Sequence, residues 1–203
     1  MLTLFHAPRS RSSRIITLLR ELDAIDKVEI EIVGITRGDG SGGKDPRNPH
    51  PEGKVPLLVH DGVVLWESIA IIQYLTDLFP EKKLAPLGGD PQRGRYISWL
   101  AWYAGVVEPV LIAQAAGVSH PYFDATFRGP TEMAARLENA LKDSPYLMGE
   151  HYSAADLLLH SPFAWYPAAT PDSAVIKGWV ERCGARPSLQ WTADFDARTE
   201  AVA

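Results

Sequence analysis

The sequence predicts an α/β N-terminal part followed by an all-helical C-terminal part. Three observations predict it: residues 1–80 alternate between strand and helix patterns, residues 80–91 form a break rich in proline and glycine, and no convincing strand pattern follows that break. A parallel strand pair joined by a helix, with an antiparallel hairpin beside it, makes a small mixed sheet. We therefore expect one domain at residues 1–80, a linker at 81–90 and a helical domain at 91–203.

The first part reads as strand, helix, strand, hairpin and helix. Residues 2–6 are a short apolar run, and residues 28–32 alternate between aliphatic side chains and Glu, as a half-exposed strand does. Residues 56–65 predict a hairpin that turns at an Asp-Gly pair. Between the first two strands, and again at residues 68–79, apolar residues recur at helical spacing. These two apolar faces consist of Ile15, Ile16, Leu18, Leu19 and Leu22, and of Ile69, Ile72, Leu75 and Phe79.

The second part carries helical patterns at residues 90–116, 131–141, 153–165 and 173–183. Pro109 falls inside the first of these, and we expect it to kink or divide the helix. In the second pattern Met133, Leu137 and Leu141 share one side.

Residues 34–53 contain six glycines and three prolines and show no periodic pattern. A structureless segment of this length inside a compact domain is unusual, and such segments are often functional or mobile. No P-loop pattern occurs in it, because the required Gly-x-x-x-x-Gly-Lys-Ser/Thr spacing is absent.

Composition excludes several classes of protein. The 203 residues are 46% hydrophobic and 22% charged, as in ordinary globular domains, and the net charge of -5 gives no basic field for nucleic acid. The single cysteine, Cys183, excludes an intrachain disulfide or a Cys-based zinc site, and the histidines offer no metal pair at helical spacing, so no metal is expected. The most apolar run, residues 99–107, is shorter than the roughly 20 residues of a membrane span. Without a signal peptide pattern, we expect a soluble, cytoplasmic protein.

Residues 8–14, PRSRSSR, lie where the first strand becomes a helix. The plain interpretation is helix capping by a serine. The functional interpretation is that a serine hydroxyl at a helix N-terminus donates to a bound anion such as a thiolate. No neighbouring acid or histidine is taken as an activating base, so anion stabilisation is favoured over a serine nucleophile.

A second group of residues surrounds the predicted hairpin. If the bond between Val55 and Pro56 is cis, the Val55 backbone turns outward and offers its N–H and C=O to a ligand. Ser68 sits at another strand-to-helix transition with Glu67 beside it, and the plain interpretation is again a helix cap with a solvated glutamate. Two such helix starts on one side of the sheet suit a zwitterion with two carboxylates, an ammonium and a thiol.

These motifs resemble the cytosolic glutathione S-transferase family. The resemblance rests on Ser10-x-x-x-Arg14, on GKVPLL at residues 53–58 and on WESIAI at residues 66–71, and it is greatest to the serine-type theta and delta classes and their bacterial relatives. A fourth motif, GEHYSAAD at residues 149–156, resembles the capping box and hydrophobic staple of the family. The four motifs occur in order along essentially the whole chain.

The resemblance implies a thioredoxin-like N-terminal domain that holds glutathione and an all-helical C-terminal domain. It assigns Ser10 to the glutathione sulfur, the Val55 backbone to the cysteinyl part, and Glu67 and Ser68 to the γ-glutamyl group. Lys54 matches a position that helps to hold the glycyl end.

Two questions stay open at the level of the sequence. Ser12 and Ser13 compete with Ser10 for the sulfur. Family members usually carry a helix where this chain has its glycine-rich segment, so the partner of the glycyl carboxylate is left open among Arg37, Lys44 and His50.

The implied activity is addition of the glutathione thiolate to small hydrophobic electrophiles, with glutathione as co-substrate. Trp102, Tyr103 and Trp165 are candidates for lining the hydrophobic pocket, and the resemblance implies a homodimer. Two alternatives remain: a non-catalytic binding or scaffold protein of the same fold, and a glutathione-dependent isomerase or peroxidase.

Overall fold

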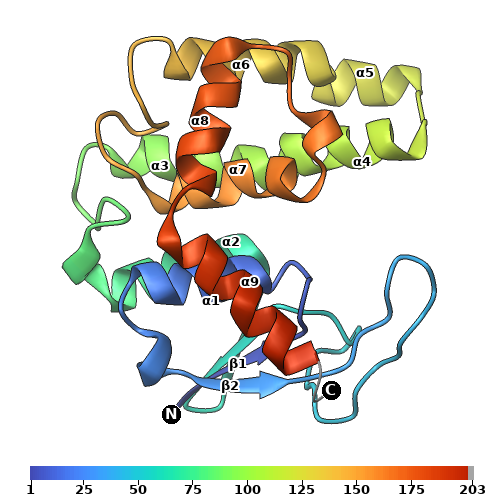
Figure 1. Cartoon of the computed structure of the whole chain (residues 1–203), viewed down its shortest axis with the longest axis vertical. Helices are drawn as coiled ribbons and strands as arrows, with labels where there is room; N and C mark the ends of the chain where they lie inside the picture. The colour runs from blue at the N-terminus through green and yellow to red at the C-terminus, as the bar shows by residue number, and fades with distance from the viewer. Residues whose placement is uncertain (201–203) are drawn as a thin grey trace. The chain divides into compact units, whose positions relative to one another are not determined.

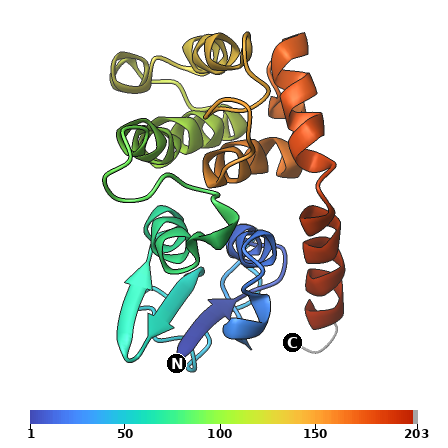
Figure 2. The same cartoon turned by 90° about the vertical axis from the view of Figure 1, so that its left-hand side faces the viewer.

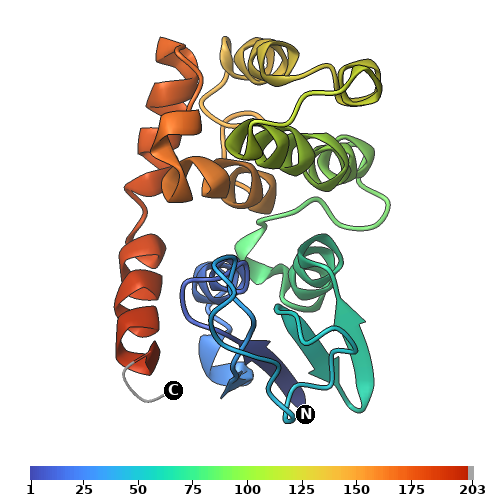
Figure 3. The same cartoon turned by 90° about the vertical axis from the view of Figure 1, so that its right-hand side faces the viewer.

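The computed structural model describes residues 1–200, which divide into two compact units (Figure 1). The first unit comprises Met1–Lys82 together with the C-terminal helix α9 (Pro187–Glu200), and the second comprises Lys83–Arg186. The sequence pattern predicts one helical domain for residues 91–203. The structure differs at the C-terminus because α9 packs against α1 (Ser13–Glu21) of the first unit (Figure 3).

The first unit is built on a four-stranded mixed sheet in the order β2-β1-β3-β4. Its strands are β1 (Leu2–His6), β2 (Glu29–Ile32), β3 (Leu57–His60) and β4 (Val63–Trp66). Strand β1 runs parallel to β2 and antiparallel to β3, and β3 pairs antiparallel with β4. The tight turn uses Asp61 and Gly62, whose φ values of 49° and 84° suit a primed hairpin turn. The predicted mixed sheet is confirmed.

Helices α1 and α2 (Ser68–Leu78) lie over the same face of this sheet (Figure 2). The predicted apolar face of α1 is confirmed, since all five of its aliphatic residues are buried. On α2 the buried side chains are Ile71, Ile72, Leu75 and Thr76, so the buried stripe differs from the predicted one at two positions. Two short 3-10 helices, Ile25–Lys27 and Pro80–Lys82, complete the unit.

The second unit is helical throughout. Its elements are α3 (Arg93–Trp102), α4 (Glu108–Ala116), α5 (Pro121–Phe127), α6 (Pro130–Leu141), α7 (Ala154–Trp165), a 3-10 turn (Pro167–Ala169) and α8 (Ala174–Gly184). The predicted side of α6 is confirmed, because Met133, Leu137 and Leu141 are its buried residues. The sequence patterns did not predict α5 or α9.

The helix is distorted in the turn that precedes Pro109. Five residues of π-helix, Tyr103–Val107, separate α3 from α4, and the helical path continues through them. A proline lacks the N–H of a normal helical turn and its ring crowds the preceding turn, and a π turn is the local widening that accommodates such a defect.

The combined helical stretch Arg93–Ala116 is long and apolar enough to cross a membrane, and 44% of its most apolar window is buried. The nine-residue run considered in the sequence is thus part of a longer apolar helix. Length and composition are weak evidence for a span, because the core helix of a folded domain meets the same criterion. Here α3 packs against α7 inside the second unit.

Candidate active site

The turn between β1 and α1 brings three serine hydroxyls together. Ser12 is the N-cap residue of α1, yet its side chain makes no capping hydrogen bond. Instead the Ser10 Oγ accepts the Ser12 N–H at 3.1 Å and lies 2.7 Å from the Ser12 Oγ. The plain interpretation of these serines as simple caps therefore does not describe this turn.

Ser12 and Ser13 are committed to partners inside the first unit. The Ser12 Oγ is fully buried and lies 2.7 Å from the His6 Nδ1, besides contacts with the Ala7 N–H and C=O. The Ser13 Oγ donates to the Asp196 Oδ2 at 2.6 Å. By contrast, within residues 1–200 the Ser10 hydroxyl makes hydrogen bonds to Ser12 alone. Of the three serines, Ser10 is the one with bonding capacity left for a ligand.

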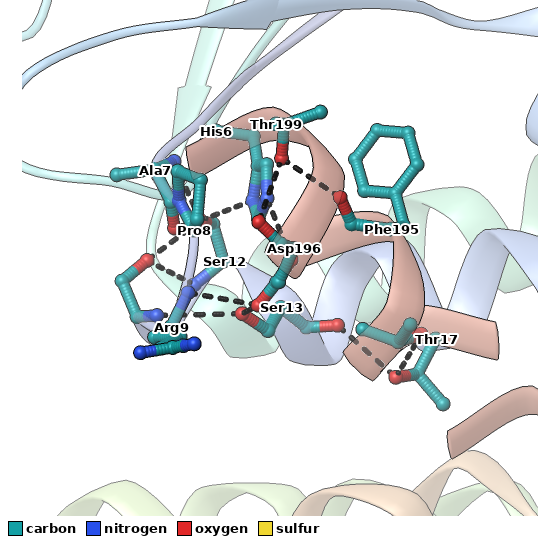
Figure 4. A network of polar contacts seen from close by, with 12 residues as sticks. His6, Ala7, Pro8, Arg9, Ser12, Ser13, Thr17, Phe195, Asp196 and Thr199 are labelled. Carbon is teal, nitrogen blue, oxygen red and sulfur yellow. Dashed lines mark hydrogen bonds and ion pairs between the residues drawn. The ribbon is translucent and has the colours of Figure 1, made fainter. Parts of the chain in front are cut away.

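His6 and Asp196 complete this cluster, and neither is among the site residues predicted from the sequence (Figure 4). The His6 Nε2 lies 3.0 Å from the Asp196 Oδ1, and the ring is entirely buried between Ser12 and α9. The Arg9 N–H donates to the other carboxylate oxygen at 2.8 Å. The interpretation that no acidic residue or histidine lies near this turn in the sequence is wrong for His6, which stands two residues before Pro8, and Asp196 joins it from 190 residues further along the chain.

Asp196 has a low pKa despite its burial. Burial by itself would raise the pKa of this carboxyl, but hydrogen bonds from His6, Ser13 and the Arg9 N–H outweigh it and lower the pKa below its ordinary value of 3.8. Asp196 is therefore a carboxylate at neutral pH, and it accepts a hydrogen bond from the His6 Nε2.

The second group of predicted residues lies at the start of β3. The bond between Val55 and Pro56 is cis. Within residues 1–200 the Val55 N–H and C=O make no hydrogen bond. The buried Asn48 holds the preceding residue by donating to the Lys54 C=O at 3.1 Å, and the Lys54 ammonium itself is exposed and paired with Glu52. A backbone donor and acceptor at Val55 are therefore left for a peptide-like ligand.

The third group is the start of α2. Glu67 is the N-cap, with no side-chain capping hydrogen bond, and its φ of 70° and ψ of 125° lie outside the ordinary left-handed well. Such a conformation costs about 1–3 kcal/mol for a residue with a side chain and tends to occur at functional sites. Glu67 is exposed and Ser68 half-buried, and neither side chain is bonded within the described residues. The capping interpretation of Ser68 is wrong, because the cap is one residue earlier.

The glycine-rich segment is less structureless than its composition predicts. Thr36 and Gly42 form an isolated antiparallel bridge, and the Arg37 guanidinium donates to the Pro8 and Arg9 carbonyls at 3.0 and 3.2 Å. The segment is thereby tied to the serine-bearing turn, although it contains no helix.

The candidates for the glycyl carboxylate all have partners within this segment or near it. Arg37 binds the two carbonyls of the serine-bearing turn, the Lys44 Nζ donates to the Pro51 C=O at 2.8 Å, and the His50 Nδ1 accepts the Glu52 N–H at 3.0 Å. His50 is also buried. The structure does not single out one of them.

The candidates for the hydrophobic pocket occupy three different settings. Tyr103 is buried, Trp102 is half-buried with the Arg136 guanidinium 5.1 Å from its ring centroid, and Trp165 is 57% exposed. Their role in binding an electrophile stays a prediction.

Comparisons with known proteins match both units. The family model described as "Glutathione S-transferase, N-terminal domain" matches residues 4–83, and "Glutathione S-transferase, C-terminal domain" matches residues 100–187. The chain belongs to the glutathione S-transferase family. The predicted thioredoxin-like N-terminal domain and all-helical C-terminal domain are thereby confirmed.

The relatives agree with this assignment. Glutathione S-transferase GstA of Escherichia coli O157:H7 is 28% identical over 146 residues, which cover 70% of this chain and 73% of that protein. The disulfide-bond oxidoreductase YfcG of Escherichia coli K12 is 28% identical over 216 residues, covering 93% and 92%. GstA and the solved glutathione transferase structures support a glutathione S-transferase enzyme, whereas the name of YfcG gives a different activity.

Two solved structures are similar over almost the whole chain. A glutathione transferase from Methylococcus capsulatus has a TM-score of 0.78 and 29% identity, covering 97% of this chain and 99% of that one. A sphingomonad glutathione S-transferase complexed with glutathione has a TM-score of 0.75 and 25% identity, covering 96% and 98%.

Proposed function

We propose that this glutathione S-transferase adds the glutathione thiolate to small hydrophobic electrophiles, with the Ser10 hydroxyl donating to the sulfur. The observation that carries the proposal is the set of hydrogen-bond partners of the three serine hydroxyls. Ser12 and Ser13 are held by His6 and Asp196, whereas Ser10 keeps bonding capacity at the start of α1. This arrangement favours the serine-type mechanism of the theta and delta classes.

The contacts at this site are strong enough to lower the pKa of the bound thiol to near neutrality. A free thiol has a pKa near 8.5, and lowering it by two units requires about 2.7 kcal/mol of differential stabilisation. A hydrogen bond to an ion contributes about 1.5–3 kcal/mol, and the N-terminus of a helix adds about 0.3–1 kcal/mol. Ser10 and the start of α1 together supply the required amount.

The remaining glutathione contacts follow the same reasoning. The unbonded Val55 backbone suits the cysteinyl peptide group, and the exposed Glu67 with its strained backbone suits the ammonium of the γ-glutamyl group. Ser68 beside it donates to the carboxylate, and Lys54 is free to turn from Glu52 to the glycyl end. The sphingomonad relative complexed with glutathione supports this ligand.

A second candidate is glutathione-dependent reduction of disulfides, which the YfcG relative favours. The only cysteine of the chain is buried, and burial raises the pKa of the Cys183 thiol, so the protein's own sulfur would not take part. Exchange would then run between glutathione and the disulfide at the same thiolate site. A non-catalytic scaffold, in contrast, would bind glutathione without ionising it.

The Ser10→Ala variant tests the serine mechanism. We expect a higher pKa of the bound thiol, read from the ultraviolet thiolate band across pH, and a kcat about tenfold or more lower, because about 1.4 kcal/mol is tenfold in rate. Glutathione affinity should change little. Ser98→Ala on α3 is the matched control and should leave both readings unchanged, since its hydroxyl bonds only to the Gly94 C=O among the described residues.

An unchanged thiol pKa in Ser10→Ala would contradict the serine assignment. Absence of a thiolate band in the unsubstituted protein would favour the scaffold alternative. Parallel assays with an activated aryl chloride and with a small disulfide separate conjugation from disulfide reduction. Homodimeric assembly and a cytoplasmic location stay predictions.

A further inference from the structure

Four side chains form a continuous buried path of hydrogen bonds, here called the relay: Asp196, His6, Ser12 and Ser10. Figure 4 shows the first three of them. The path runs from the Asp196 Oδ1 to the His6 Nε2 at 3.0 Å, from the His6 Nδ1 to the Ser12 Oγ at 2.7 Å, and from there to the Ser10 Oγ at 2.7 Å. His6 and Ser12 are both entirely buried. The relay therefore connects α9 to the serine hydroxyl proposed to meet the sulfur.

The protonation of His6 decides which way the hydroxyl protons point. Because the Asp196 carboxylate only accepts, the His6 Nε2 carries a proton in either charge state. In the neutral ring the Nδ1 is an acceptor, so the Ser12 hydroxyl donates to it. The 2.7 Å contact between Ser12 and Ser10 is then a hydrogen bond only if the Ser10 proton points inward.

In the imidazolium form the two steps between His6 and Ser10 reverse, while the His6 Nε2 still donates to Asp196. The His6 Nδ1 now donates to the Ser12 Oγ, which also accepts the Ala7 N–H at 3.1 Å. The Ser12 proton then has two acceptors, the Ala7 C=O at 3.2 Å and the Ser10 Oγ at 2.7 Å, and the shorter contact favours Ser10. Since that oxygen already accepts the Ser12 N–H, the Ser10 proton points away from the relay, toward a ligand.

We propose that His6 and Asp196 are positioning residues that act through Ser12 on Ser10, and that the thiol proton of glutathione passes along the relay to the His6 Nδ1. The S–H bond breaks as the Ser10 Oγ takes that proton, Ser10 passes its own proton to Ser12, and Ser12 passes its own to His6. The product is a thiolate that accepts from Ser10 and an imidazolium beside Asp196. This inference rests on the proposed role of Ser10.

The charged surroundings of His6 fit this transfer. From α9 the ring meets the Asp196 carboxylate and, at 5.8 Å between centroids, the Phe195 ring. Two other charged side chains near the turn have partners of their own: the Arg9 guanidinium pairs with Glu200 at 3.2 Å, and Arg37 donates to the Pro8 and Arg9 carbonyls. Asp196 thus faces the ring as the counter-charge that an imidazolium needs.

Nitrogen NMR of the unsubstituted protein, labelled at histidine, tests the transfer without any variant. At a pH where the thiolate band is present, glutathione should convert the His6 ring from neutral to imidazolium, with the signal assigned from a His6→Asn spectrum. S-methylglutathione, which has no thiol proton, should leave the ring neutral. A ring whose charge state is the same with and without glutathione, while the thiolate forms, would overturn the proposal.

The Asp196→Asn variant tests the role of α9. An amide donates to the His6 Nε2 and places the ring proton on Nδ1, so that atom no longer takes up a proton. We expect the pKa of the bound thiol to rise by about one unit, a tenfold loss of thiolate below that pKa. Thr192→Val is the matched control, because Thr192 lies in the same contact of α9 with α1 but outside the relay, and it should leave the thiol pKa unchanged.

The two proposals fail in different ways. If Ser10→Ala leaves the thiol pKa unchanged, the proposed function at Ser10 fails. If Ser10→Ala raises it but Asp196→Asn does not, Ser10 stands and the relay is wrong. If Thr192→Val raises it as much as Asp196→Asn does, the effect of Asp196 is merely structural.

Discussion

Each unit of this protein buries one aspartate among hydrogen-bond donors, and the two aspartates behave in opposite ways. Asp196 in the first unit accepts hydrogen bonds from His6, Ser13 and a backbone N–H. Asp156 in the second unit accepts from Trp179, from Ser153 and from two backbone N–H groups. Burial raises the pKa of Asp156 against these bonds, whereas the pKa of Asp196 is lowered.

Burial is the largest influence on both carboxyls, and it prevails only at Asp156, which is entirely buried, whereas Asp196 keeps an exposed fraction of 5%. The donors of Asp156 are amide, hydroxyl and indole groups that stay neutral, and the capping box at the start of α7 needs nothing more. At Asp196 the hydrogen bonds from His6, Ser13 and the Arg9 N–H outweigh burial, and so the ionised form is stabilised. A buried carboxylate with neutral donors supports the fold, while one that faces a histidine beside a hydroxyl is suited to chemistry.

The largest expected effect is the loss of stability when the buried Asp156 is removed. Asp156→Ala leaves the indole of Trp179 and two backbone N–H groups buried without their acceptor, and each such group costs about 1–3 kcal/mol. We expect the free energy of unfolding to fall by about 3 kcal/mol or more, measured by urea denaturation. Asp172→Ala, which removes an exposed ion pair with Lys177, should cost less than about 1 kcal/mol. Equal losses in the two variants would contradict the structural role of Asp156.

The two carboxyls should change the pH dependence of the unfolding free energy in opposite directions. The folded pKa of Asp196 is below the unfolded value near 3.8, so its contribution is present above that value and is lost as the pH falls through the folded pKa. The folded pKa of Asp156 is above 3.8, so the folded state loses stability as the pH rises from 3.8 through it.

Unfolding free energies measured from about pH 3 to pH 6 check this prediction. Asp196→Asn should reduce the fall in unfolding free energy that occurs as the pH drops below 3.8. Asp156→Asn should reduce the fall in unfolding free energy that occurs as the pH rises above 3.8. The same sign of change in both variants would show that the two environments do not differ as described.

The smallest expected effect concerns the contact of α1 with α9 outside the relay. The Thr17 and Thr192 hydroxyls lie 2.9 Å apart, and each also bonds to a carbonyl of its own helix. Thr192→Val therefore leaves Thr17 with an acceptor, and we expect a loss of about 0.5–1.5 kcal/mol in the free energy of unfolding. A loss as large as that of Asp156→Ala would mean that this contact, too, is a main support of its unit.

The residues that the sequence proposes for the site carry local signals, and their role in binding glutathione stays a prediction. The family resemblance assigns them from short motifs, two at strand-to-helix transitions and one just before β3, and the structure leaves the Val55 backbone and the Glu67 side chain unbonded within residues 1–200. His6 and Asp196 carried no such signal. His6 is the last residue of a strand, where a buried polar side chain breaks no pattern, and its partner lies in a helix that the sequence patterns did not predict.

Helix α9 shows why pattern reasoning failed there. Its buried residues are Ser188, Thr192 and Asp196, one helical turn apart, so the buried stripe is polar and has no hydrophobic period. Ser188 bonds to Glu21, Thr192 to Thr17 and Asp196 to Ser13, in steps of four residues along both helices. The polar stripe is recognisable only once its partner helix is known.

The sequence by itself determined the elements whose causes lie within a few residues: the apolar faces of α1 and α6, the Asp-Gly hairpin and the capping box of α7. Only the tertiary structure decided which unit receives α9, that the glycine-rich segment is tied to the serine-bearing turn, and which of the serines keeps bonding capacity. The physical reason is the range of the interactions. Periodicity and capping act between residues up to four apart, whereas His6 and Asp196 meet across 190 residues, and no local pattern encodes that pair.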